Sequence, residues 1–252
     1  MSRRKLPGFS TDSGTPLVGK PSKTITWNEI PQWQKHNKYI FSGYRRSQYT
    51  WGGCIHSVFA YLHNETVNIH SHLWGGVFFL YLLGTVRTER LTVHETTWLD
   101  SALFALFLFS AMFCHISSAL YHTSICHSRD VESRCHAFDY TGIIVLNLGS
   151  HYPLLYYGFF CEPHYQLIYI LSITVLNLAA AFVVLDPEYA KPTHIGDFNG
   201  SFSLDLSMFL ELYFMQTVFR RGFHQELLII SFLPIKFSMV VSSLPRTCTT
   251  YL

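Results

Sequence analysis

The chain has 252 residues, of which 49% are hydrophobic and only 13% are charged, and its formal net charge is +2. Soluble domains usually carry about 25% charged residues, so this composition and a mean hydropathy of +0.19 argue against an ordinary soluble domain. The small net charge gives no sign of a nucleic-acid partner. The six cysteines do not form the pattern of a disulfide scaffold. The composition therefore predicts a chain exposed to lipid.

The N-terminal segment, residues 1–63, is polar and contains nine of the eighteen lysine and arginine residues. Its first half is rich in Pro and Gly, which predicts disorder, and it lacks the apolar core of a signal peptide. Residues 26–45 are rich in Trp, Tyr and basic side chains, a composition typical of a segment that lies among lipid headgroups. A small soluble helix is the alternative for this second part.

Four apolar runs follow, and each is close to the roughly 20 residues that a membrane-spanning helix needs. They cover residues 69–86, 98–121, 140–160 and 166–185. The connections between them are short, which favours antiparallel neighbours. Two weaker apolar segments, residues 201–219 and 227–244, are interrupted by charged residues or proline. The sequence predicts an all-α, multi-pass transmembrane helix bundle at residues 64–186, with one or two less certain helices in a divergent tail, residues 187–252.

The basic residues predict the orientation of this bundle. Their excess before the first helix places the N-terminus in the cytoplasm. The first helix then begins at the cytoplasmic face, the second ends there and the third begins there. Polar residues from three separate parts of the chain are therefore expected in one layer near the inner leaflet. They are Glu65, Asn68 and His72 from the first helix, Ser118 and His122 from the second, and Asp139 from the third.

These polar residues form a candidate functional site, because ionisable groups are costly at membrane depth. Ser118 and His122 share one helical face, together with His115. A neutral imidazole is a common zinc ligand, and a nearby carboxylate such as Asp139 can orient the imidazole or a metal-bound water. The alternative is that His122 joins helices through hydrogen bonds to serine and aspartate.

A soluble zinc finger is a further interpretation of the same region. Its ligands would be Cys126, His127, Cys135 and His136. The eight residues between the two cysteines and their position at helix ends are unusual for such a finger.

Several sequence blocks, in order and with suitable spacing, resemble the progestin and adipoQ receptor family, which includes the adiponectin receptors and the haemolysin-III-related proteins. The blocks are HNKYIFSGYR (36–45), NETVNIHSHLWG (64–75), the HTSICHS block that begins at His122, FDYTGI (138–143) and GSHYPLLYYGFFC (149–161). Together they cover roughly residues 27–186.

The resemblance implies a seven-helix membrane protein of the plasma membrane or endoplasmic reticulum, with a zinc ion near the cytoplasmic leaflet. By resemblance, His122 is a zinc ligand, Asp139 holds the metal-bound water, and Ser118 is the family serine beside it, so Asp139 and Ser118 are the expected catalytic residues. Glu65, Asn68 and His72 match the first family motif. The implied partners are membrane lipids with a ceramide-like or sterol ligand, or a protein ligand. Some members are proposed to hydrolyse ceramide-type lipid amides, and fungal relatives are linked to zinc and sterol homeostasis.

The chain departs from the family pattern after Asp139. The family draws two more zinc ligands from a His-x3-His pair, and no such pair follows Asp139 here. Recognisable motifs end near His194, and the remainder resembles a truncated or frame-shifted tail. Two interpretations follow. The chain represents a receptor or zinc-dependent lipid hydrolase, with an incomplete zinc site and no activity in this form, or it is a noncatalytic membrane scaffold or regulator.

Overall fold

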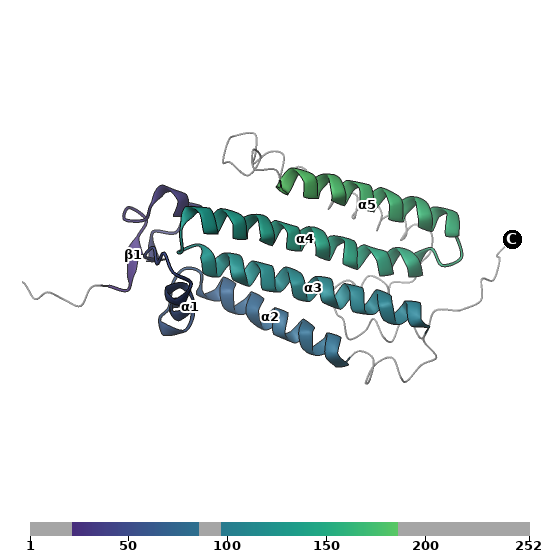
Figure 1. Ribbon diagram of the computed structural model, residues 1–252, viewed down its shortest axis with the longest axis horizontal. Helices are drawn as coiled ribbons and strands as arrows, with labels where there is room; N and C mark the ends of the chain where they lie inside the picture. The colour runs from purple at the N-terminus through teal and green to yellow at the C-terminus, as the bar shows by residue number, and fades with distance from the viewer. Residues whose placement is uncertain (1–21, 86–96, 186–252) are drawn as a thin grey trace, which may run out of the picture.

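The structure is a computed structural model that describes residues 22–85 and 97–185. The Pro- and Gly-rich N-terminal region and the weak apolar segments at 201–219 and 227–244 lie outside these residues, so the predictions for them stay untested. The described part is mostly helical, with a small N-terminal lobe and four long helices. Figure 1 shows the long helices side by side, with the lobe at one end of them.

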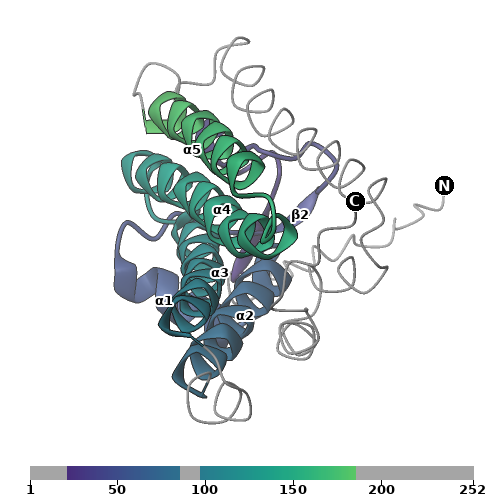
Figure 2. The same cartoon turned by 90° about the vertical axis from the view of Figure 1, so that its right-hand side faces the viewer.

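Each of the four long helices contains most of one apolar run, but the third of them begins eleven residues before its run, at Arg129. They are α2 (Thr66–Thr85), α3 (Trp98–Ser124), α4 (Arg129–Gly158) and α5 (Pro163–Leu185). Each packs against its neighbour in the sequence, and the end-on view in Figure 2 shows them stacked in that order. Among the described helices, α3 and the Pro163–Phe182 part of α5 are long and apolar enough to cross a membrane. Membrane crossing by α2 and α4 stays a prediction.

Helix α3 begins at a capping box and is tied there to the far end of α4. The Thr97 side chain accepts the Asp100 N–H at 3.2 Å, and the Asp100 carboxylate accepts the Thr97 N–H at 2.8 Å. This reciprocal pair satisfies backbone donors that the first turn leaves free. The Tyr157 hydroxyl of α4 donates to the same Asp100 carboxylate at 2.6 Å. The beginning of α3 and the end of α4 therefore meet, as antiparallel neighbours must.

Small residues allow α3 and α4 to approach closely. A Cβ atom on Gly142 would collide with Ser117 Oγ, and one on Gly149 would collide with Ser110 Oγ. Both serine hydroxyls are bonded within their own helix, to Cys114 O and Phe107 O, and so need no acceptor on α4. Small residues that face each other at a helix–helix interface commonly allow helices to associate in membranes.

The N-terminal lobe consists of a two-stranded antiparallel sheet, β1 (Thr24–Thr26) and β2 (Ser42–Arg45), a 3-10 turn at Gln32–Gln34, and helix α1 (Trp51–Ala60). Its small core contains Ile25, Ile30 and Tyr44. Residues 26–45 are therefore folded largely as strand and turn, and the alternative of a small soluble helix is wrong. Contact of this segment with lipid headgroups stays a prediction.

Backbone hydrogen bonds fix the lobe against the turn between α3 and α4. The Gln48 N–H donates to Cys126 O at 2.7 Å, and the Tyr49 N–H donates to His127 O at 3.1 Å. The lobe is thus held at the end of the bundle where α2 begins, α3 ends and α4 begins (Figure 1).

Candidate functional site

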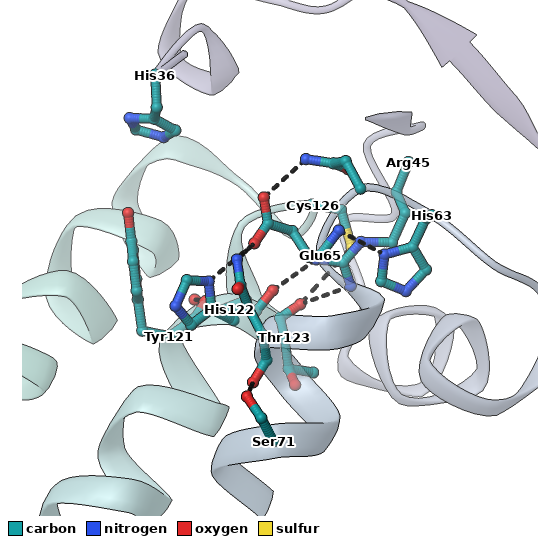
Figure 3. A network of polar contacts seen from close by, with 12 residues as sticks. His36, Arg45, His63, Glu65, Ser71, Tyr121, His122, Thr123 and Cys126 are labelled. Atoms are coloured by element: carbon teal, nitrogen blue, oxygen red, sulfur yellow. Dashed lines mark hydrogen bonds and ion pairs between the residues drawn. The ribbon is translucent and has the colours of Figure 1, made fainter. Parts of the chain in front are cut away.

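The centre of the candidate site is a hydrogen bond between α3 and the residue that precedes α2. His122 Nδ1 lies 2.9 Å from Glu65 Oε2 (Figure 3). A carboxylate only accepts hydrogen bonds, so the proton between the two groups belongs to Nδ1. The lone pair of a neutral His122 ring is then on Nε2. This is the tautomer that leaves Nε2 available to a metal ion or a hydrogen-bond donor.

Glu65 is itself held by two amide side chains. Asn64 Nδ2 donates to Oε1 at 2.7 Å, and Asn68 Nδ2 donates to Oε2 at 2.9 Å. Burial raises the pKa of Glu65, but the hydrogen bonds from His122 and Asn68 outweigh burial and hold the pKa below its ordinary value. Glu65 is therefore a fixed carboxylate at neutral pH, able to orient His122.

Two further histidines extend the cluster. His72 and His115 face each other with their Nδ1 atoms 3.2 Å apart, so one nitrogen donates and the other accepts. The His72 ring also stacks on His122, with centroids 5.7 Å apart and planes at 12°. The absence of a side chain at Gly75 makes room for His115, because a Cβ there would lie 2.9 Å from His115 Nδ1. Imidazole rings thus line the contact between α2 and α3.

Ser118 and Asp139 meet beside this cluster. Ser118 on α3 is buried, and its hydroxyl is close enough to interact with the Asp139 carboxylate on α4. Asp139 also interacts electrostatically with His122. The structure therefore brings the six predicted residues together, from α2 and the residue before it, from α3 and from α4. Their roles as catalytic or metal-binding residues stay predictions.

Arg45 is a part of the site that sequence reasoning missed. Its side chain is only 2% exposed and lies against the last turn of α3 (Figure 3). Nη2 donates to His122 O at 2.6 Å, while Nη1 donates to Thr123 O at 3.2 Å and to Ser57 Oγ at 3.1 Å. These carbonyls have no partner within the helix, and a cation is favoured at a helix C-terminus. Arg45 therefore joins the lobe, including α1, to the turn that carries His122.

An open cavity adjoins the site between the lobe and the bundle. It has a volume of about 370 Å³, including the part open to solvent. Its lining includes His36 and Tyr44 from the lobe, together with Arg45, Glu65 and Cys126. The cavity gives solvent a way to the carboxylate that holds His122.

The residues that the structure describes do not complete a zinc site. Among them, no three His, Cys, Asp or Glu side chains are arranged to hold a metal ion. Catalytic zinc sites normally have three protein ligands, and here His122 offers one nitrogen with Asp139 nearby. The Cys/His zinc finger is not formed either, because Cys126 Sγ contacts Cys54 and His127 Nδ1 contacts Ser128.

The sequence is similar to haemolysin-III-related proteins and to proteins named as adiponectin or progestin receptors. The sequence model of the haemolysin-III-related family matches residues 60–244, and so extends beyond His194, where the recognisable motifs end. The ADIPOR-like receptor IZH2 of Saccharomyces cerevisiae is 31% identical over 192 residues, which are 75% of this chain and 60% of the relative.

Two animal proteins also match this chain. The adiponectin receptor protein of Drosophila melanogaster is 30% identical over 174 residues, 68% of this chain and 38% of the relative. Progestin and adipoQ receptor family member 3 of Homo sapiens is 34% identical over 175 residues, 69% of this chain and 55% of the relative. The chain thus spans between 38% and 60% of the length of these three relatives.

Proposed function

This chain belongs to the haemolysin-III-related family, and we propose that it is an integral membrane receptor-like protein with a metal-binding cluster near the cytoplasmic side of the bilayer. Relatives named as adiponectin and progestin receptors support a receptor-like role. The excess of basic residues before the first helix supports a cytoplasmic N-terminus. The proposed location is the plasma membrane or the endoplasmic reticulum.

The hydrogen bond between Glu65 and His122 is the observation that carries the metal-binding proposal. A histidine that binds a metal ion usually donates its other ring N–H to a carboxylate, which fixes the ring and raises the basicity of the ligand nitrogen. Glu65 has this relation to His122, and the two amides on Glu65 hold it in place. The proposed metal is zinc, with His122 as one ligand and Asp139 and Ser118 beside it. The remaining ligands have to come from outside the described residues.

For the full-length family form, the proposed activity is hydrolysis of a ceramide-type lipid amide, with a role in lipid or zinc homeostasis. Its proposed partners are membrane lipids, a ceramide-like or sterol ligand, and a protein ligand. This chain by itself is proposed to be inactive as a hydrolase.

A second candidate is a noncatalytic membrane scaffold or regulator. The contacts that favour it are those that join α2 to α3: the Glu65–His122 hydrogen bond and the His72–His115 contact. Polar contacts between transmembrane helices can serve association alone. In this role the cluster needs no metal ion.

Zinc content measured by mass spectrometry on the purified, monodisperse chain separates the two candidates. The metal-binding proposal predicts that zinc co-elutes with the wild-type protein in size-exclusion chromatography and is absent from the His122→Ala variant. His164→Ala is the matched control, because His164 is exposed on α5. A folded wild-type protein without zinc would overturn the metal-binding proposal and favour the scaffold. Release of fatty acid from a ceramide by this chain would overturn the statement that it is inactive.

A further inference from the structure

Two buried thiols face each other where the lobe meets the bundle. Cys54 lies on α1, and Cys126 lies in the turn between α3 and α4. Their exposed fractions are 0% and 1%, and their sulfur atoms are 3.6 Å apart with a hydrogen bond between them. A disulfide bond is about 2.05 Å long, so the two sulfurs have to approach each other by roughly 1.5 Å to form one.

The surroundings of the pair make one of the two thiols reactive. The hydrogen bond with Cys54 lowers the pKa of Cys126 to about 7 against the opposing effect of burial, and the nearby Arg45 guanidinium lowers it further. The same hydrogen bond, together with burial, raises the pKa of Cys54. The thiolate is the form of cysteine that reacts, and a cation beside a thiol favours it. These opposite shifts favour the thiolate on Cys126 over the thiolate on Cys54.

A small oxidant has a route to this thiolate. Although little of Cys126 is accessible on the outer surface, the residue lines the open cavity beside Arg45 and Glu65. The Cys54 sulfur is in contact with the Cys126 sulfur. A reactive thiol at a cavity with a second thiol in contact is the arrangement of a cysteine with its resolving partner.

We propose that Cys54 and Cys126 form a reversible disulfide, a modification site that responds to hydrogen peroxide. The Cys126 thiolate attacks one peroxide oxygen, the O–O bond breaks, and the leaving hydroxide takes up a proton to become water. The resulting sulfenic acid is attacked by Cys54 sulfur, which loses its proton as the S–O bond breaks and a second water leaves. Two thiols and one peroxide thus give one disulfide and two waters.

This modification would link two parts of the fold that are 72 residues apart in the sequence. Gln48 and Arg45 already hold the lobe to the same turn, through Cys126 O and the last carbonyls of α3. The disulfide would make this attachment covalent beside the cavity that leads to Glu65. The inference concerns thiol chemistry and does not depend on whether His122 binds zinc.

The test uses the full chain in detergent micelles, with monodispersity checked by size exclusion. The protein is treated with hydrogen peroxide, blocked with N-ethylmaleimide and digested with chymotrypsin under non-reducing conditions. We expect a peptide that links Cys54 to Cys126, formed in most of the protein and released by dithiothreitol. Cys54→Ser and Cys126→Ser should each abolish this peptide. Cys114→Ser and Cys135→Ser are matched controls, because both positions are also free thiols, and should leave it unchanged.

Wild-type protein alone decides the outcome if the buried serine variants fail to fold. Recovery of both cysteines as maleimide adducts after peroxide treatment would overturn the proposal. So would a peptide that links Cys126 to Cys135, or Cys126 recovered only as sulfinic acid with Cys54 still alkylated.

Discussion

His122 Nδ1 lies 2.9 Å from Glu65 Oε2, and this contact joins the last turn of α3 to the start of α2. The two residues are 57 positions apart in the sequence. The side chains of Glu65 and His122 are 13% and 19% exposed, so water competes little for the hydrogen bond. The contact fixes both the relative position of two helices and the tautomer of one imidazole.

Replacement of Glu65 by glutamine tests both effects. The amide has nearly the shape of the carboxylate, but it can donate as well as accept, so it no longer fixes the His122 tautomer. We expect zinc affinity to fall 10- to 100-fold, as is typical when the partner of a ligand histidine is lost. Loss of a charged hydrogen bond should also lower the free energy of unfolding by about 1–2 kcal/mol. Zinc titration and thermal unfolding in detergent measure the two effects, with exposed Glu162→Gln as the control.

The sequence predicted the long helices and the meeting of the polar residues, but not the lobe. Apolar runs near the length of a membrane span identify α2 to α5 directly, and alternating helix direction brings Glu65, His122 and Asp139 to one end. The burial of Arg45 depends on a strand pairing and on carbonyls of a helix 77 residues away, which no local pattern encodes. The contact of Cys54 with Cys126 is missed for the same reason, since the two residues are 72 positions apart in the sequence.

The close approach of α3 and α4 predicts a large effect from a single methyl group. Gly142→Ala places a Cβ against Ser117 Oγ, and overpacking of this kind typically costs about 1–3 kcal/mol. Gly158→Ala is the matched control, because nothing lies within 4 Å of a Cβ at that end of the same helix. Unfolding temperatures in one detergent compare the variants. Adding Ser117→Ala to Gly142→Ala removes the colliding oxygen and should restore part of the loss. An unchanged melting temperature for Gly142→Ala would contradict the packing described.

His63 predicts a pH-dependent stability in the acid range. Burial lowers the pKa of His63 to about 4, and the Arg45 charge adds to this effect. In the unfolded chain the pKa is about 6.5, so between pH 6.5 and 4 the unfolded state binds a proton that the folded state does not. Stability therefore falls as the pH is lowered through this window, by on the order of 2–3 kcal/mol.

His63→Asn provides the test of this titration. The asparagine oxygen can keep the hydrogen bond that His63 Nδ1 accepts from the Glu65 N–H, but it does not titrate. The slope of unfolding free energy against pH should become flatter between pH 6.5 and 4 in this variant. Exposed His164→Asn should leave the slope as it is in the wild-type protein. Equal slopes in wild type and His63→Asn would assign the acid instability to other groups.

Arg45→Lys tests whether the guanidinium holds the lobe on the bundle. Two nitrogens of Arg45 donate hydrogen bonds to His122 O, Thr123 O and Ser57 Oγ. The single ammonium group of a lysine cannot reach the same three acceptors in the same geometry. Lysine keeps the positive charge, so any change in stability reports the loss of the planar guanidinium group and its hydrogen bonds. We expect a loss of about 1–3 kcal/mol in stability, since buried acceptors are left without donors.

Amide hydrogen exchange should be faster in α1 and in the last turn of α3, and unchanged in α5. Arg46→Lys is the control, because Arg46 is exposed next to it in the chain. Equal exchange rates in Arg45→Lys and Arg46→Lys would show that the backbone bonds of Gln48 and Tyr49 suffice to hold the lobe.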